Sequence, residues 1–124
     1  MNPDETVTEF IRRIVAKDVE GAFELCADHV VYENVPITAY EGKAAALEFL
    51  GGFVAGADEL DWPVHRQAAT GSVVMNERTD RFRFGEKWVE VKVVGVWEVE
   101  DGSIVLWRDY FDMAEMNAQL ATLG

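Results

Sequence analysis

The spacing of hydrophobic residues divides the chain into a helical first half and a sheet-forming second half. Hydrophobic residues three and four positions apart predict a helix with one buried face, whereas alternation predicts a strand. The first helical segment follows Pro3-Asp4-Glu5, which is a favourable helix start. Between the second and third helical segments, residues 29–36 show the valine-rich pattern of a strand. The helical segments are 7–15, 19–26 and 43–54.

The second half predicts a sheet of long strands followed by a short closing helix. The glycine-containing segments 84–87 and 100–103 are typical hairpin turns, so the strands on either side of them are expected to pair. Helices followed by a meander of strands predict an α+β fold, with N-terminal helices packed into a strongly curved mixed or antiparallel sheet. We expect this sheet to form a cone around a deep apolar pocket. The predicted strands and closing helix are 60–69, 72–84, 87–99, 103–111 and 113–123.

Composition and charge limit the partners of the protein. The 124 residues include 23 acidic and 11 basic side chains, which give a net charge of −12. This balance disfavours nucleic acid and anionic membranes as partners and favours a neutral ligand. No internal repeat or linker interrupts the pattern, so residues 1–124 are expected to form a single domain.

Location and redox state follow from what the sequence lacks. Hydrophobic residues make up 49% of the chain, yet no apolar run approaches the roughly 20 residues of a membrane-spanning helix. The N-terminus shows no signal-peptide pattern, and Cys26 is the only cysteine. A cytoplasmic location without disulfides is therefore expected.

Two strands place charged residues on a face that is otherwise largely hydrophobic. Arg78 and Asp80 lie two residues apart among large apolar residues in segment 72–84, and Asp109 is the only charged member of its face in segment 103–111. A buried carboxylate is costly without a partner, and Arg78 is the candidate partner of Asp109. The two predicted inward faces are Val74, Asn76, Arg78, Asp80, Phe82 and Phe84, and Val105, Trp107, Asp109 and Phe111.

The early strand adds two polar side chains, and the pattern as a whole has more than one interpretation. Tyr32 and Asn34 lie two residues apart, and their hydroxyl and amide groups are suited to holding one water molecule. The acid–arginine–acid cluster can support the fold, catalyse a reaction or bind a ligand, and the pattern alone leaves all three open. His29 and His65 do not have the spacing of metal ligands, so no metal site is expected.

Three motifs contain these residues: Tyr32-Glu33-Asn34-Val35-Pro36, Asn76-Glu77-Arg78-Thr79-Asp80 and Trp107-Arg108-Asp109-Tyr110-Phe111-Asp112. In their order and approximate spacing the chain resembles the limonene-1,2-epoxide hydrolase family, which has the cone fold of nuclear transport factor 2. The resemblance covers about residues 7–116. It implies an epoxide hydrolase without cofactors that adds water to a neutral, lipophilic epoxide in one step, giving a vicinal diol.

The resemblance also implies a role for each residue of the cluster. Asp109 would take a proton from water, and Tyr32 and Asn34 would hold that water. Asp80 would donate a proton to the epoxide oxygen, and Arg78 would bridge the two carboxylates.

Apolar residues of the strands and of the third helix are expected to form the substrate-binding wall. A homodimer is also expected from the resemblance, and an exposed hydrophobic sheet face with Trp88, Val94 and Val96 would support it. The expected wall residues are Val74, Phe82, Val91, Val93, Trp107, Phe111, Leu47, Leu50 and Phe53.

Other functions remain open at this stage. An isomerase or cyclase of the same fold would use an aspartate to remove a proton from carbon. A non-catalytic carrier of small apolar ligands would need the cluster only to satisfy buried charge. A two-step hydrolase that forms an aspartyl ester would need a separate base, usually a histidine, and both His29 and His65 lie outside the three motifs.

Overall fold

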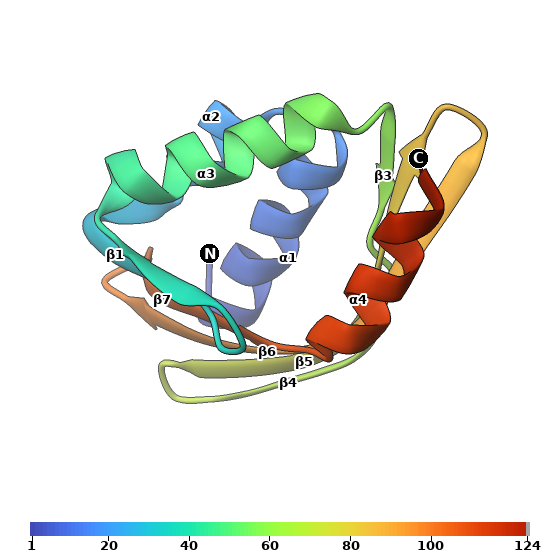
Figure 1. Cartoon of the computed structure of the whole chain (residues 1–124). Helices are drawn as coiled ribbons and strands as arrows, with labels where there is room; N and C mark the ends of the chain where they lie inside the picture. Colours follow the sequence, from blue (N-terminus) through green and yellow to red (C-terminus); the bar gives the residue numbers. More distant parts are fainter. Residues whose placement is uncertain (124) are drawn as a thin grey trace.

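Helices lie against the concave face of one strongly curved sheet in the computed structural model, which describes residues 1–123 (Figure 1). The helix α1 lies within the curve of the sheet, and α3 crosses its open side. The elements in chain order are α1 (Pro3–Val15), α2 (Val19–Phe23), β1 (Cys26–Asn34), β2 (Thr38–Glu41), α3 (Lys43–Gly56), β3 (Glu59–Asp61), β4 (Val64–Thr70), β5 (Val73–Phe84), β6 (Lys87–Glu100), β7 (Ser103–Tyr110), α4 (Met113–Leu120) and the 3-10 helix η1 (Ala121–Leu123).

The sheet is mixed, which is one of the two arrangements that the sequence prediction allowed. Its strand order is β2-β1-β7-β6-β5-β3, and β4 also pairs with β5. The pair β1–β7 is parallel, and the other pairs are antiparallel. The early strand β1 therefore lies beside the last strand, which brings the first motif next to the third.

Two details of the sheet differ from the sequence prediction. The edge strand β2 was not predicted, because its four residues are mostly exposed and carry no apolar alternation. The predicted strand 60–69 is divided into β3 and β4 at Trp62-Pro63. Proline has no backbone N–H for a ladder hydrogen bond, and the break leaves the Trp62 side chain buried in the interior.

The first helix has a well-capped start and a buried hydrophobic stripe. The Asn2 side chain accepts a hydrogen bond from the Glu5 backbone at 2.8 Å, and the Glu5 carboxylate accepts one from the Asn2 backbone at 3.0 Å. On the buried face, the ring of Phe10 makes edge contacts with Phe23, Trp97 and Trp107. This helix therefore packs against the concave side of β6 and β7, and β7 carries the third motif.

The inward face that the sequence predicts for β5 agrees with the structure. Val74, Asn76, Arg78, Asp80 and Phe82 are all buried, and Phe84 is half-buried. On β7 the predicted inward face is wrong near the start of the strand. The register of its pairing with β6 shifts there, between Glu98 and Val99 of β6. Ile104 is consequently buried there, and Val105 is only half-buried.

The last helix, α4, lies along the rim of the sheet and buries none of its residues. The Gln119 side chain accepts a hydrogen bond from the Glu90 backbone at 2.7 Å, and Lys87 Nζ donates to the Thr122 carbonyl at 2.9 Å. Met116 and Leu120 pack against the inner valines of β6. Within residues 1–123 no helix combines the length and the apolar character needed to cross a membrane.

The Asp112 cap is expected to control the stability of α4. Its carboxylate accepts hydrogen bonds from the backbone of Ala114 at 2.8 Å and Glu115 at 3.2 Å. Such a cap is worth about 1 kcal/mol, so Asp112→Ala should speed amide hydrogen exchange in α4 about fivefold. Amides of β5 and β6 should keep their protection, and Glu115→Ala, which removes an acid without a cap, is the control. Unchanged exchange in α4 of Asp112→Ala would show that packing alone holds the helix.

Candidate active site

Polar residues form one row across five strands of the concave face. Asn34 on β1 pairs with Asp109 on β7, Asp109 with Gly95 on β6, and Gly95 with Asn76 on β5. Gln67 on β4 continues the row beyond Asn76. Paired residues of neighbouring strands point to the same face, so these groups lie side by side, with a gap at the glycine.

Arg78 lies between the two acids. It follows Asn76 by two residues on β5, and its side chain reaches from the next row toward Asp109. The Arg78 Nε and Nη2 atoms donate to the two carboxylate oxygens of Asp80 at 2.9 Å each. The Nη2 atom also donates to Asp109 Oδ2 at 2.9 Å. The Arg78 guanidinium therefore contacts both carboxylates.

Burial makes this cluster electrostatically strong. Arg78 is 1% exposed, Asp80 5% and Asp109 4%. Burial raises the pKa of Asp109 to about 6, and the repulsion of Asp80 adds to this rise, although the attraction of Arg78 opposes it. Burial alone would lower the pKa of Arg78, but the two carboxylates more than offset this and raise it, so the guanidinium stays charged.

A column of stacked aromatic rings lies beside Asp109. The ring of Tyr32 stacks on Trp107 at a centroid distance of 4.1 Å, and Trp107 stacks on Trp97 at 4.9 Å. Trp107 Nε1 donates to Asp109 Oδ1 at 2.8 Å and so fixes the orientation of that carboxylate. Burial, together with the charge of Asp109, raises the pKa of Tyr32, so its hydroxyl stays protonated.

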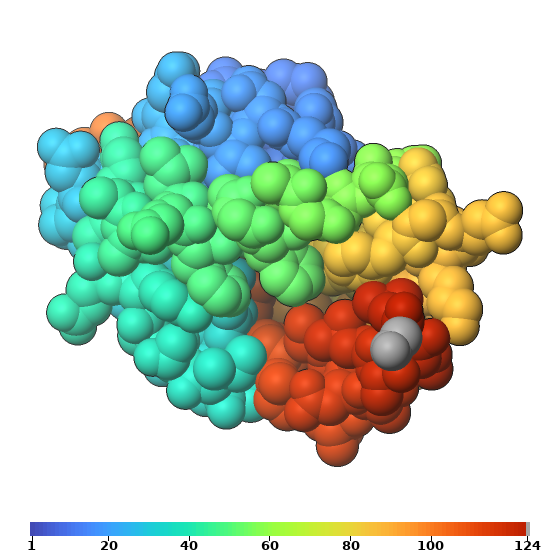
Figure 2. Space-filling model, turned by 45° about the horizontal axis from the view of Figure 1, so that its top comes forward, coloured from blue at the N-terminus to red at the C-terminus, as the bar shows by residue number. Residues whose placement is uncertain are grey.

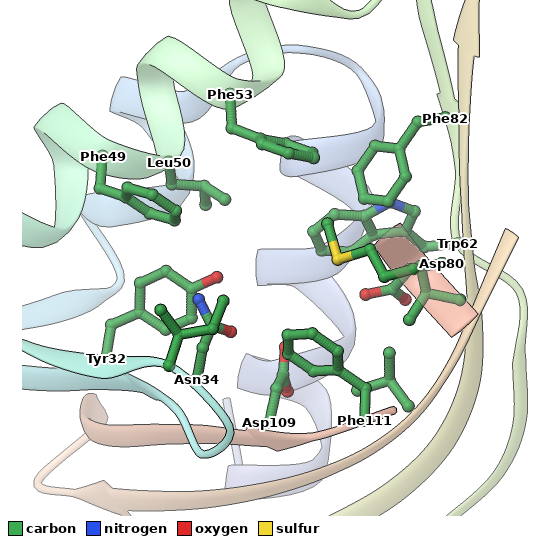
Figure 3. A pocket seen from close by; sticks show the side chains of 14 residues that line it. Tyr32, Asn34, Phe49, Leu50, Phe53, Trp62, Asp80, Phe82, Asp109 and Phe111 are labelled. Atoms are coloured by element: carbon green, nitrogen blue, oxygen red, sulfur yellow. The ribbon is translucent and has the colours of Figure 1, made fainter. Parts of the chain in front are cut away.

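The two acids face a cavity that opens between α3 and α4. Figure 2 shows the mouth as a hollow between these helices, and the space free of protein atoms, mouth included, is about 520 Å³. Figure 3 shows the carboxylates of Asp80 and Asp109 at the cavity together with Tyr32 and Asn34, and aromatic rings on the opposite side. The remaining lining residues are apolar or aromatic. They are Ile37, Phe49, Leu50, Phe53, Trp62, Phe82, Val91, Val93, Phe111 and Met116.

Three of the expected wall residues do not line this cavity. Leu47 faces a groove beside Lys17 and Val19, because its side of α3 packs toward α2. Val74 is fully buried in the core, and Trp107 is covered by the rings of its aromatic column. The other expected residues are present on the wall: Leu50, Phe53, Phe82, Val91, Val93 and Phe111.

Four wall residues were not found from the sequence. Phe49 lies one residue before Leu50 on α3, and Met116 comes from α4, whose hydrophobic spacing is weak. Ile37 lies in the turn between β1 and β2. Trp62 precedes a proline at a break in the sheet, and its indole nitrogen is buried without a hydrogen-bond partner among the described residues. The Trp-Pro pair was the one available signal, since proline interrupts strands.

Neither histidine contributes to the cavity. His29 and His65 are exposed, and the ring of His65 contacts the Thr79 hydroxyl at 2.8 Å on the outer surface. Within residues 1–123 no three His, Cys, Asp or Glu side chains are grouped so that they could hold a metal ion.

Comparison with known proteins identifies the family. The model of the limonene-1,2-epoxide hydrolase catalytic domain matches residues 1–122. The chain belongs to this family. Epoxide hydrolase EphG of Mycobacterium tuberculosis (strain ATCC 25618 / H37Rv) is 36% identical over 110 residues, which cover 89% of this chain and 73% of EphG.

Solved structures agree with this assignment. An LEH-like epoxide hydrolase from M. tuberculosis is 33% identical, with a TM-score of 0.84 over 98% of this chain and 93% of that chain. SalBIII, an epoxide hydrolase/cyclase-like enzyme, is 21% identical and has a TM-score of 0.81 over 91% of this chain and 92% of its own. At 21% identity, the likeness to SalBIII shows the fold alone. The predicted membership of the limonene-1,2-epoxide hydrolase family and the predicted α+β fold are both confirmed.

The buried charge of Asp109 is expected to destabilise this limonene-1,2-epoxide hydrolase fold. The folded protein binds the Asp109 proton up to about pH 6, whereas the ordinary aspartate value is 3.8, so the contribution of Asp109 to stability falls as the pH rises through this window. Asp109→Asn removes the charge but keeps the size of the side chain. Relative to the wild type, its free energy of unfolding should become more favourable between pH 4 and pH 8, as measured by urea denaturation. A variant that is less stable at pH 8 by the same margin as at pH 4 would contradict this account.

Proposed function

We propose that the protein hydrolyses a neutral, lipophilic epoxide to a vicinal diol in one step, with Asp109 as the base and Asp80 as the acid. The observation that carries this proposal is the guanidinium of Arg78 shared by two buried carboxylates that both face one apolar cavity. Membership of the limonene-1,2-epoxide hydrolase family supports the reaction class.

The chemistry of an epoxide explains why two acids are needed. Water is a weak nucleophile until it loses a proton, and the epoxide oxygen is a poor leaving group until it gains one. In the proposed step a water proton moves to Asp109 while the water oxygen forms a bond to an epoxide carbon. The bond between that carbon and the epoxide oxygen breaks, and the proton of Asp80 passes to the departing oxygen. A base and an acid on opposite sides of the breaking bond carry out both transfers together.

The shared arginine supports the two opposite protonation states. Two neighbouring carboxyl groups resist double ionisation, and we propose that they share one negative charge and one proton during the reaction. Arg78 contacts both groups and therefore stabilises that charge on either of them. After turnover Asp109 holds the proton and Asp80 the charge, and transfer of the proton back to Asp80 restores the starting state.

Tyr32 and Asn34 are proposed to hold the attacking water beside Asp109. Both line the cavity, and Asn34 is the cross-strand neighbour of Asp109. The protonated Tyr32 hydroxyl offers one donor, and the Asn34 amide offers both a donor and an acceptor. Three groups around one water fix the direction of its lone pair toward the substrate.

The apolar wall selects the substrate class. Besides the two acids, Tyr32 and Asn34, the cavity is lined by hydrophobic and aromatic side chains, so a charged substrate would lose its hydration without compensation. We therefore propose a hydrocarbon-like epoxide that places only its oxygen near the acids.

A cyclisation is the second candidate, because the epoxide hydrolase/cyclase-like SalBIII shares this fold. In that reaction a hydroxyl group of the substrate replaces the water and forms a cyclic ether. A two-step route through an aspartyl ester is less well supported, because both histidines are exposed outside the cavity.

The homodimer and the cytoplasmic location stay predictions. The outer face of the sheet exposes Val94 and, paired with it, Tyr110, which would suit a second copy of the chain. Trp88, which was expected to join that face, is half-buried with the guanidinium of Arg81 over its ring at 4.2 Å.

A panel of neutral epoxides of increasing size tests the proposed reaction. The wild-type protein should release diols, and in a single turnover in ¹⁸O-labelled water the label should appear in the diol and not in the protein. Asp80→Asn and Asp109→Asn should each lower kcat at least about 100-fold, because each removes one of the two proton transfers. Chiral chromatography measures the diols and the rate of their release, and mass spectrometry measures the position of the label.

Asp61→Asn is the matched control, since Asp61 is a half-buried acid outside the cavity that also pairs with an arginine. It should keep wild-type turnover. Unlabelled diol in the first turnover would establish the ester route. A cyclic ether or a rearranged product would establish the alternative enzyme class. Tight binding without any product would establish a carrier.

The pH dependence of turnover follows from the environment of Asp109. The base must be ionised, and burial raises its pKa to about 6. The value of kcat/KM should therefore fall tenfold per pH unit below about pH 6, as Asp109 takes up a proton. Rates corrected for spontaneous acid hydrolysis of the epoxide between pH 4.5 and 8 test this. A profile that stays flat down to pH 4.5 would argue against Asp109 as the base.

A further inference from the structure

The guanidinium of Arg78 has a third side that neither acid occupies. There the Nη1 atom donates to Asn76 Oδ1 at 3.0 Å, and Trp97 Nε1 donates to the same oxygen at 3.3 Å. Asn76 is 3% exposed and lies outside the cavity. We infer that Asn76, together with the gap at Gly95, is a positioning residue that aims Arg78 at both acids without adding charge. This inference rests on the proposed function.

Gly95 provides the space through which Arg78 reaches Asp109. In the row across the sheet, Gly95 lies between Asp109 and Asn76. A Cβ atom on Gly95 would lie 2.5 Å from Arg78 Nη1 and 2.7 Å from Asn76 Oδ1. Both distances are shorter than van der Waals contact, so any side chain at position 95 would displace the guanidinium or its acceptor.

A chain of hydrogen bonds decides which end of the Asn76 amide faces Arg78. The Gln67 amide nitrogen donates to the Asp4 carboxylate at 2.8 Å and to the Thr8 hydroxyl at 3.0 Å, which turns the Gln67 carbonyl toward Asn76. Asn76 Nδ2 then donates to that carbonyl at 3.0 Å. Because a carboxylate only accepts and a guanidinium only donates, the chain from Asp4 to Arg78 has one direction. The Asn76 oxygen must therefore point at the arginine.

A neutral acceptor matters because two carboxylates already share the positive charge of Arg78. The charged or titratable groups facing Asp109 are Arg78 and Asp80 from β5 and Tyr32 from β1. β6 presents Val93, Gly95 and Trp97 there, and the walls from α3 and α4 are apolar. A third carboxylate on the guanidinium would repel charge on both acids. An amide satisfies the same N–H group and leaves the positive charge for the acids.

Asn76→Asp and Asn76→Leu separate positioning from simple structural support. Asn76→Asp keeps the acceptor and adds a charge, so the acid limb of kcat/KM should move upward by about one pH unit or more, with activity recovered at higher pH. Asn76→Leu removes the acceptor without adding charge. Its kcat should fall about tenfold at every pH, with KM nearly unchanged.

The matched control is Ala68→Asp, which adds the same charge on the exposed side of β4, one residue from Gln67. Its pH profile should equal that of the wild type. Gln67→Leu, at a half-buried position, is the second variant if position 76 does not tolerate change, and it should lower kcat about threefold with an unchanged KM. Variants that lose thermal stability but keep the wild-type kcat and pH limb would overturn the positioning role.

Titration of the ¹³C-labelled Asp109 carboxyl by NMR tests the inference without turnover. The pH at the midpoint of this titration should rise in Asn76→Asp and stay unchanged in Ala68→Asp. If no epoxide is turned over but this midpoint still moves, the proposed function fails and the positioning role stands. If epoxides are hydrolysed and neither the midpoint nor kcat responds at position 76 or 67, the positioning role is wrong.

Discussion

One guanidinium buried among apolar side chains must have hydrogen-bond acceptors around it, and this requirement organises the centre of the sheet. Each N–H group left without an acceptor would cost about 1–3 kcal/mol. Asp80 and Asp109 occupy two sides of Arg78 and Asn76 the third. Indole rings of Trp62 and Trp97 lie within 5.6 and 5.8 Å of the guanidinium carbon, so its faces also meet side chains that stabilise positive charge. The backbone contributes by leaving position 95 without a side chain.

The balance of charge in this cluster favours chemistry over structural support. A structural ion pair needs one acid for one base, and even that pair often adds little stability. Here a second acid shares the same arginine, and burial outweighs the attraction of Arg78 enough to raise the pKa of Asp109 to about 6. The fold therefore bears a cost that a simpler pair would avoid. Such an arrangement is useful where one carboxyl group must lose a proton while its neighbour gains one.

The sequence predicted the features that depend on strand alternation, and it missed those that depend on packing between elements. A period of two residues is enough to place Arg78 and Asp80 on one face, and an apolar row is enough to mark Asp109 as unusual. The roles of Gly95 and Asn76 depend on the register between β5, β6 and β7, which single-strand patterns do not contain. The same limit applies to the walls. Whether Leu47 or Phe49 faces the cavity depends on how α3 is rotated against α2 and the sheet.

The polar groups of the site and most of its apolar wall come from different elements of the structure. Asn34, Asp109 and Asn76 belong to one row of a continuous sheet, where hydrogen bonds between strands hold each position rigidly. Phe49 and Met116, in contrast, come from α3 and α4, and α4 buries none of its residues. Changes in the helices can therefore reshape the cavity while the geometry around Arg78 stays the same. This division gives a physical reason why one fold can accommodate cavities of different shape. The row holds Asp109 and its polar neighbours in place, and the helices determine the shape of the cavity beside them.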